Sequence, residues 1–312
     1  MPNGFEVGDT LPGCAAVMRL LGGSPAGTAA YMTSWLLVEQ PGPWTADALE
    51  RVCDEVFPAQ RMDALRAAGL RPLLIRRPGR HRREPGAPRT VYLASGLPGG
   101  RWLERLEIAD LAELAALDLE AVTRGRGGHG TPVAGPLFLA CTHGTKDMCC
   151  AVLGRPVAAA LGENHPGRAW EVSHVGGDRW AGNLLVVPDG YLHGQLSPDE
   201  AALVAKSALA GQVQLDQLRG RTSAPTAYAQ YAEIAVRRRA GLRGLDEAIA
   251  VGESRPDPVD ENLRLVSVRT PEGVYEVAVR RGPAVDGAAS RCSARIAPAG
   301  YSVLSVHLLA TV

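Results

Sequence analysis

Two short stretches of the chain carry the side chains best suited to chemistry. The first, LACTHGTKDMCCAVLGRP at residues 139 to 156, contains three of the six cysteines. The second, SHVGGDRWAGN at residues 173 to 183, contains a histidine and an aspartate. Thiolates, imidazoles and carboxylates bind transition metals, and a thiolate can also act as a redox nucleophile. Metal binding and thiol chemistry are therefore the first two hypotheses.

The elements around the first stretch place two cysteines at element ends. The apolar run LFLA at 137–140 predicts a strand that leads into Cys141. The segment CAVLGRPVAAALGE at 150–163 predicts a helix that begins at Cys150. Because the amino end of a helix favours negative charge, a cysteine there has a lowered pKa, and the thiolate is the form that binds metal.

The second stretch begins where another predicted strand ends. The segment RAWEVS at 168–173 predicts that strand, and His174 follows it directly. Gly176 and Gly177 come next, and two glycines allow the backbone to turn tightly around a bulky cofactor. We therefore expect a cofactor-binding loop at this position.

The residues alone leave several alternatives open. The cysteines can be buried thiols that pack as small apolar side chains. Two cysteines, a histidine and an aspartate can also form a tetrahedral zinc site. Cys150 can act as a redox thiol without metal, although the chain has no Cys-x-x-Cys motif. Asp178 can cap a turn or pair with Arg179 instead of binding a metal.

Other residues near the two stretches have simpler interpretations. His143 is a candidate substitute ligand or a hydrogen-bond donor to a ligand, and otherwise a histidine of a surface loop. Lys146 and Asp147 are expected to pair and stabilise the loop. The remaining cysteines stand alone in the sequence, and we expect structural or incidental roles for Cys14, Cys53 and Cys292.

Composition limits the partners and the compartment. The chain has 312 residues, with 33 Lys and Arg against 33 Asp and Glu, so no global field attracts nucleic acid or an anionic membrane. The amino-terminal residues do not have the pattern of a secretory signal, and no apolar run reaches membrane-spanning length. We therefore expect a cytoplasmic protein, in which clustered cysteines bind metal or react more often than they form disulfides.

The order of predicted elements occurs twice. The first set has strands at 34–40, 71–77, 90–95 and 101–108, two helices that Pro58 separates after a candidate cap at Thr45, and a helix at 108–122. The second set has strands at 137–140, 168–173, 183–188 and 191–196, the helix at 150–163, and a helix that starts at Ser197 and Pro198. A glycine-rich segment at 123–136 suits a linker between the two sets.

This repetition predicts an α/β fold of two degenerate, tandem thioredoxin-like units and a small C-terminal β element. The predicted limits are 1–125 for a unit without ligands, 135–222 for a ferredoxin-like unit, and 223–312 for a helical segment with the β element. The β element, roughly 259–312, carries no chemical motif that we identify. The basic segment RRPGRHRR at 76–83 is a solvated loop or a docking patch for an acidic redox partner.

The motifs resemble those of the sucrase/ferredoxin-like family, which is related to the thioredoxin-like ferredoxins. The matching segments are CTHGTKDMCC, GRPVAAAL and SHVGGDRWAGN, and GTAAYMTSWLLVEQPGPW is similar to the N-terminal half of bacterial members. The resemblance covers most of residues 14 to 220.

The resemblance implies a 2Fe-2S cluster, which two cysteines and two histidines hold in characterised fungal relatives. Transferred position by position, the ligands are Cys141, Cys150 and His174, and the fourth position is Asp178 where the family has a second histidine. With one carboxylate, the oxidised cluster and its ligands carry a charge of 1− instead of 0. Histidine ligands raise the reduction potential, and a carboxylate reverses part of that rise. We expect an intermediate potential and a labile cluster.

The resulting expectation is an iron-sulfur protein for electron transfer or redox sensing, a carrier and not a catalyst. It implies a redox partner protein, and no nucleic acid or membrane. The alternatives are a thioredoxin-fold interaction protein that has lost the cluster, a zinc protein, or a thiol oxidoreductase that uses Cys150. The sequence does not indicate the oligomeric state, the electron donor or the electron acceptor.

Overall fold

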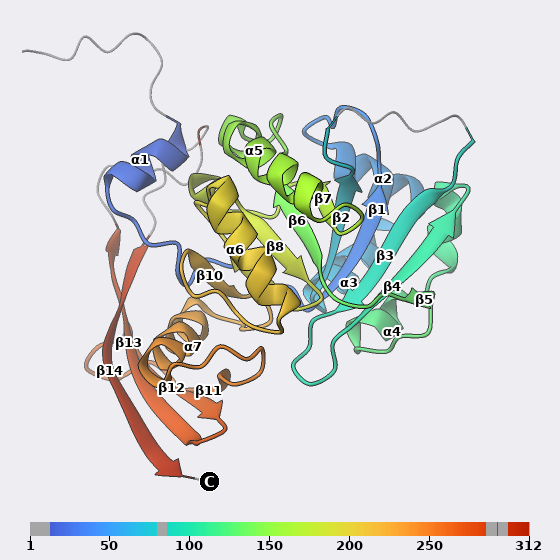
Figure 1. The fold of residues 1–312 in the computed structure, drawn as a ribbon. Helices are drawn as coiled ribbons and strands as arrows, with labels where there is room; N and C mark the ends of the chain where they lie inside the picture. The colour runs from blue at the N-terminus through green and yellow to red at the C-terminus, as the bar shows by residue number, and fades with distance from the viewer. Residues whose placement is uncertain (1–12, 80–85, 285–291, 293–298, 312) are drawn as a thin grey trace, which may run out of the picture.

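The main sheet of the protein is mixed and has ten strands, and a separate antiparallel sheet has four (Figure 1). The computed structural model describes residues 13–79, 86–284, 292 and 299–311. The fold is α/β, as the sequence predicts. Among the described residues, no helix combines the length and the apolar character needed to cross a membrane.

The elements follow the chain in three groups. The first group is α1 (Cys14–Leu20), β1 (Ser34–Glu39), α2 (Ala48–Val56), α3 (Ala59–Ala67), β2 (Leu70–Arg76), β3 (Arg89–Ser95), β4 (Trp102–Ile108), the 3-10 helix η1 (Leu111–Ala116) and α4 (Leu119–Thr123). The second is β5 (Thr131–Pro132), β6 (Leu137–Cys141), α5 (Met148–Asn164), β7 (Ala169–Val172), the 3-10 helix η2 (Asp178–Trp180), β8 (Leu184–Val187), β9 (Tyr191–His193), α6 (Pro198–Leu209) and β10 (Leu218–Arg221). The third is α7 (Ala227–Ala240), β11 (Ile249–Glu253), β12 (Leu263–Thr270), β13 (Gly273–Ala284) and β14 (Ala299–Thr311).

Both halves of the large sheet have the same connectivity. The strand order is β10-β9-β8-β6-β7-β2-β1-β3-β4-β5. In the first half β1 pairs parallel with β2 and antiparallel with β3, which pairs antiparallel with β4. In the second half β6 pairs parallel with β7 and antiparallel with β8, which pairs antiparallel with β9. The halves meet where β2 and β7 pair antiparallel. This order is compatible with thioredoxin-like units, and the predicted domain limits stay a prediction.

Local sequence signals explain where several helices begin. Ser197 caps α6 in a capping box with Glu200, and Pro198 occupies the first turn, as predicted. Pro58 separates α2 from α3, also as predicted, but the residue that precedes α2 is Asp47 and not Thr45. The cap at Thr45 was therefore wrong by two positions.

The helix predicted over 108–122 is interrupted. Asp110 caps η1, and Asp118 starts a new helix because its side chain accepts a hydrogen bond from the Ala121 amide. A second capping residue within the segment favours the start of a new helix over continuation of the first one. The segment therefore forms two short helical pieces.

The glycine-rich segment at 123–136 is held against the sheet. The carboxylate of Glu104 accepts hydrogen bonds from the amides of Gly128, His129 and Gly130, at 2.7 to 3.0 Å. The short strand β5 then pairs with β4. The composition is typical of a linker, but these contacts order the segment.

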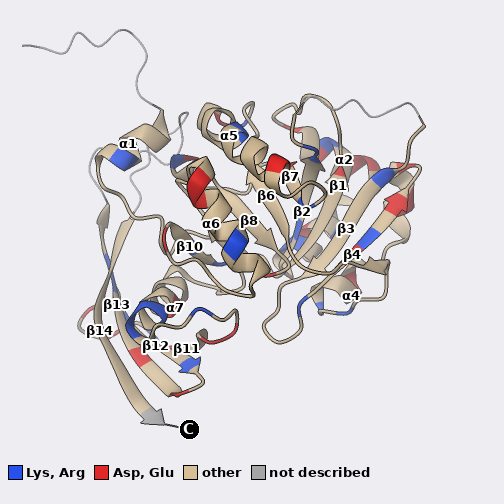
Figure 2. Cartoon of the chain, viewed as in Figure 1, with Lys and Arg blue, Asp and Glu red and all other residues tan. Residues whose placement is uncertain are grey.

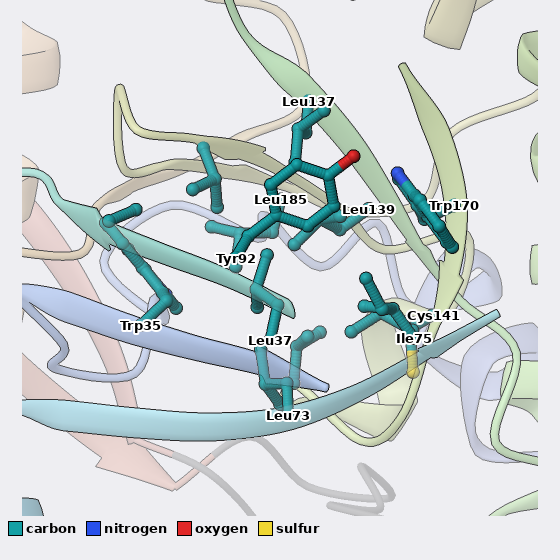
Figure 3. Close-up of a cluster of buried hydrophobic side chains, with 14 of the residues drawn as sticks. Trp35, Leu37, Leu73, Ile75, Tyr92, Leu137, Leu139, Cys141, Trp170 and Leu185 are labelled. Carbon is teal, nitrogen blue, oxygen red and sulfur yellow. The ribbon is translucent and has the colours of Figure 1, made fainter. Parts of the chain in front are cut away.

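One core is shared by both halves of the large sheet. Its members include Trp35 and Leu37 of β1, Tyr92 of β3, and Leu185 of β8, although β1 and β8 are not neighbours in the sheet (Figure 3). The same cluster includes Cys141, so the carboxyl end of β6 is anchored in apolar packing. Helices α5 and α6 cover the opposite side of the second half through a separate cluster.

The C-terminal part forms the predicted β element, with β11 to β14 in sequential antiparallel order beside α7. The strand candidate at 293–298 lies outside the described residues. Basic and acidic residues are interspersed over the described elements (Figure 2), in keeping with the balanced charge of the chain.

Candidate metal centre

Close packing of α5 against the end of β6 positions the two cysteines. Cys141 is the last residue of β6, and Cys150 lies in the first turn of α5, which Asp147 caps by accepting a hydrogen bond from the Cys149 amide at 2.9 Å. Gly154 allows the approach, because a Cβ there would lie 1.9 Å from the Cys141 carbonyl oxygen. Only glycine at this position lets the helix carry Cys150 to the end of the strand.

The loop after β7 carries the other two predicted ligands. The Nδ1 atom of His174 lies 3.2 Å from Oδ1 of Asp178, and the Cys150 sulfur lies 3.6 Å from the same oxygen. Gly176 and Gly177 have φ values of +83° and +79°, which favour glycine. The predicted glycine turn therefore brings Asp178 back toward His174.

The predicted site residues converge. One donor atom each from Cys141, Cys150 and His174 lies within 4.8 Å of the others, and this group could hold a metal ion. Asp178 contacts two of the three donors, but its carboxylate is not part of the group that meets this distance limit. Both cysteines are 1% exposed, and the His174 side chain is 22% exposed. The donors therefore face a largely dry space, with the imidazole nearest to solvent.

The charges of the donors depend on each other. A hydrogen bond from Cys150, supported by His174, holds the pKa of Cys141 well below its usual range, although burial opposes this. The same hydrogen bond, with burial, raises the pKa of Cys150. Burial lowers the pKa of His174, but attraction to Cys141 outweighs it and the net shift is upward. Burial raises the pKa of Asp178. A bound cation would displace the proton that Cys150 retains.

A buried arginine that the sequence analysis missed lies beside the site. Arg219 of β10 is 1% exposed and donates to the Gly176 carbonyl and to Oδ1 of Asn183, each at 2.8 Å, and to both oxygens of Thr28. Among the described residues no carboxylate forms an ion pair with it, and burial lowers its pKa to about 9. A Cβ on Gly177 would lie 2.4 Å from its guanidinium. Arg219 thus offers a buried positive charge to an anionic centre.

His143 has a different environment from the donor group. Its Nε2 donates to the Thr45 carbonyl at 3.0 Å, and its ring meets Trp44 edge-on. The Lys146 ammonium lies 3.9 Å from the Glu50 carboxylate and donates to the Ala46 carbonyl. The expected pair of Lys146 with Asp147 is therefore wrong. Asp147 caps α5 instead, because its carboxylate accepts a hydrogen bond from an amide that is otherwise unpaired at the start of the helix.

A second group of donors was also missed. Cys149 lies 3.8 Å from Cys14 and 3.5 Å from Cys292, measured between sulfur atoms, and Asp147 contacts two of these cysteines. The C-terminal part carries no motif in its sequence, but the structure places Cys292 beside Cys14, Cys149 and Asp147. The three cysteines are far apart in sequence, and no spacing rule connects them.

The basic segment at 76–83 is described only in part. Arg76 forms an ion pair with Glu171 at 2.6 Å, and Arg77 stacks on Trp170. Residues 80–85 lie outside the described part of the chain. Two of the five arginines are therefore engaged in the fold.

Comparisons with known proteins identify the family. Residues 25–220 match the profile of the sucrase/ferredoxin-like family, which covers more than half of the chain and includes all four predicted ligands. Comparisons with curated proteins and with solved structures give no match. The chain belongs to the sucrase/ferredoxin-like family.

Proposed function

We propose that Cys141, Cys150, His174 and Asp178 bind one 2Fe-2S cluster, and that the protein transfers electrons or senses redox state. One observation carries the proposal: two buried sulfur atoms and an imidazole nitrogen lie within 4.8 Å of one another in a chain of this family. Thiolate and imidazole ligands are those of mixed-ligand iron-sulfur centres. When bound, such a cluster supplies reversible one-electron exchange.

The surroundings of the donors fit an anionic centre. Two thiolates and one carboxylate would leave a net charge of 1− around an oxidised cluster core. The guanidinium of Arg219, buried among neutral partners, supplies a compensating charge beside the loop that holds His174 and Asp178. Attraction from Cys141, Asp178 and Cys150 offsets part of the burial effect on the pKa of Arg219. Arg219 thus favours negative charge at these donors.

A thiol oxidoreductase that uses Cys150 is less well supported. Its thiol is 1% exposed, and its pKa is raised by the hydrogen bond to Cys141 and by burial. A reactive cysteine needs access and a lowered pKa. Cys141 has the lowered pKa but is equally buried. Neither thiol therefore combines the two properties.

A redox partner protein belongs to the same proposal, because electrons must reach a centre that the chain encloses. The His174 side chain is the most exposed of the ligand group, at 22%. We therefore expect the partner to dock over the loop between β7 and η2, where the electron path to solvent is shortest.

The proposal is tested by anaerobic reconstitution of the full chain with iron and sulfide. The wild type should develop the visible charge-transfer bands of a 2Fe-2S centre, and Cys141→Ser and His174→Ala should lose them. Cys53→Ala is the matched control, because Cys53 lies in the separate core around α2. A wild type that stays colourless while folded would support the cluster-less alternative, and zinc bound at Cys141 in place of iron would support the zinc alternative.

A further inference from the structure

A second group of donors surrounds a point between α1, α5 and the connection from β13 to β14. The sulfur atoms of Cys14, Cys149 and Cys292 lie 3.5, 3.6 and 3.8 Å apart. The carboxylate oxygens of Asp147 lie 3.4 Å from the Cys292 sulfur and 3.9 Å from the Cys14 sulfur. We infer that these four residues form a binding site for one divalent thiophilic ion, of which zinc is the expected example.

The distances match a tetrahedron around one ion. With a zinc–sulfur bond of about 2.3 Å, ligand sulfurs in a tetrahedral site lie about 3.8 Å apart, and a carboxylate oxygen lies about 3.6 Å from each sulfur. The three sulfur–sulfur distances, 3.5 to 3.8 Å, lie at or slightly below the first value, and the two oxygens of Asp147 lie 3.4 and 3.9 Å from two of the sulfurs. A disulfide requires sulfurs about 2.05 Å apart, and three thiols cannot all pair. The arrangement therefore fits an ion between the sulfurs better than bonds between them.

The backbone around the group is arranged as it is around thiolate ligands. The amide of Cys14 donates to the Cys292 sulfur at 3.4 Å. The amides of Cys149 and Cys292 donate to the two oxygens of Asp147, each at 2.9 Å. Hydrogen bonds of this kind orient ligands and offset their negative charge. Gly13 packs against the group, because a Cβ there would lie 2.6 Å from the Cys149 sulfur.

The charge balance also favours a bound cation. Three thiolates and one carboxylate around a divalent ion give the same net charge as a four-cysteine zinc site. Cys14, Asp147 and Cys149 are 2%, 5% and 8% exposed, whereas Cys292 is exposed, so water compensates the charge mainly at Cys292. Arg179 attracts Cys14, and its buried Nε has no hydrogen-bond partner among the described residues. An anionic site would supply the charge that this guanidinium lacks.

The two donor groups are distinct. Cys149 and Cys150 are adjacent at the start of α5, but Cys149 contacts Cys14 and Cys292, whereas Cys150 contacts Asp178. No donor belongs to both groups. The second site therefore does not depend on whether the first binds iron, zinc or no metal.

Four protein donors leave no open position for substrate, which is typical of structural ions. The ion would join α1, the start of α5 and Cys292, whose donor atoms are close in space and distant in sequence. Cys14 and Cys292 are 278 residues apart. The site thus fastens Cys292 and the N-terminal helix to the start of α5, which carries Cys150.

The test is metal content of the full chain, with zinc and iron measured in the same samples. The wild type should contain about one zinc ion per chain. Cys14→Ser and Cys292→Ser should each lose at least tenfold in zinc content, whereas Cys53→Ala and Cys141→Ser should retain it. Cobalt added alone to the metal-depleted wild type should give thiolate-to-cobalt charge-transfer bands. This measurement uses only the wild type, so it does not require that a variant folds.

Two results would overturn the inference. One is a folded wild type that retains no zinc and gives no thiolate bands with cobalt. The other is zinc that Cys141→Ser removes and Cys14→Ser leaves in place, since that would assign the ion to the first group. Iron content is an independent readout, so failure of the cluster proposal leaves the zinc result interpretable.

Discussion

Replacement of Asp178 by histidine removes one negative charge from the first donor group and restores the ligand type usual for the family. Oδ1 of Asp178 lies 3.2 Å from Nδ1 of His174 and 3.6 Å from the Cys150 sulfur. A unit charge at about 4 Å is worth about 4 kcal/mol at an effective dielectric constant near 20. Because about 1.4 kcal/mol corresponds to 59 mV for one electron, the reduction potential should rise by roughly 170 mV.

The assay is an anaerobic redox titration of the reconstituted wild type and Asp178→His, followed by visible absorption. Asp178→Asn separates charge from ligand type, because it removes the charge and keeps the shape. Asp63→His is the control, since the Asp63 side chain is exposed and distant in sequence from the ligands. Equal potentials in wild type and Asp178→His would refute the assignment of Asp178 to the centre.

Two further predictions concern the fold. Gly154→Ala should force α5 away from the Cys141 carbonyl, lower the free energy of unfolding by about 3 kcal/mol in urea denaturation and reduce iron loading. The control is Gly100→Ala, which has no atom near the added Cβ and should change the free energy of unfolding by less than about 0.5 kcal/mol. Equal stability of the two variants would contradict the packing argument. Burial lowers the pKa of His193 to about 4, and among the described residues the ring's one hydrogen bond is the one that Nε2 donates to the Gln214 carbonyl. The fold thus favours the neutral ring, so the contribution of His193 to the free energy of unfolding is complete above pH 6.5 and falls by about 3 kcal/mol as the pH falls toward 4. The urea midpoint of His193→Gln should therefore fall less steeply than that of the wild type over this range. Parallel curves for variant and wild type would count against the lowered pKa.

Local signals in the sequence were enough for most of the elements and for the first donor group. Ser197 with Pro198 identified the start of α6, and apolar runs bounded by glycine and proline identified the strands. His174 and Cys141 could be named because each follows a strand end within a short motif. Those signals depend on neighbours in sequence, which the fold preserves.

The second donor group could not be predicted, because its members are brought together only by tertiary structure. Cys14 and Cys149 are 135 residues apart, and Cys292 comes from the segment between two strands of another sheet. Each of them reads as an isolated thiol in the sequence. Asp147, interpreted as a partner for its neighbour, instead joins the helix cap to the cysteine group.

Arg219 was missed for a different reason. A charged residue in the short strand LRGR is typical of an exposed strand end, and nothing in the sequence indicates that the guanidinium is buried. Its partners, Gly176, Asn183 and Thr28, come from separate segments. An arginine within a buried strand would have indicated a buried guanidinium, but the sequence does not show that β10 is buried.

The most direct test of the central claim is the content of iron and acid-labile sulfide in the anaerobically reconstituted full chain, compared with Cys150→Ser. We predict about two iron and two sulfide ions per wild-type chain, and loss of both in the variant. A folded wild type that retains neither iron nor sulfide would contradict the claim that Cys141, Cys150, His174 and Asp178 hold a 2Fe-2S cluster.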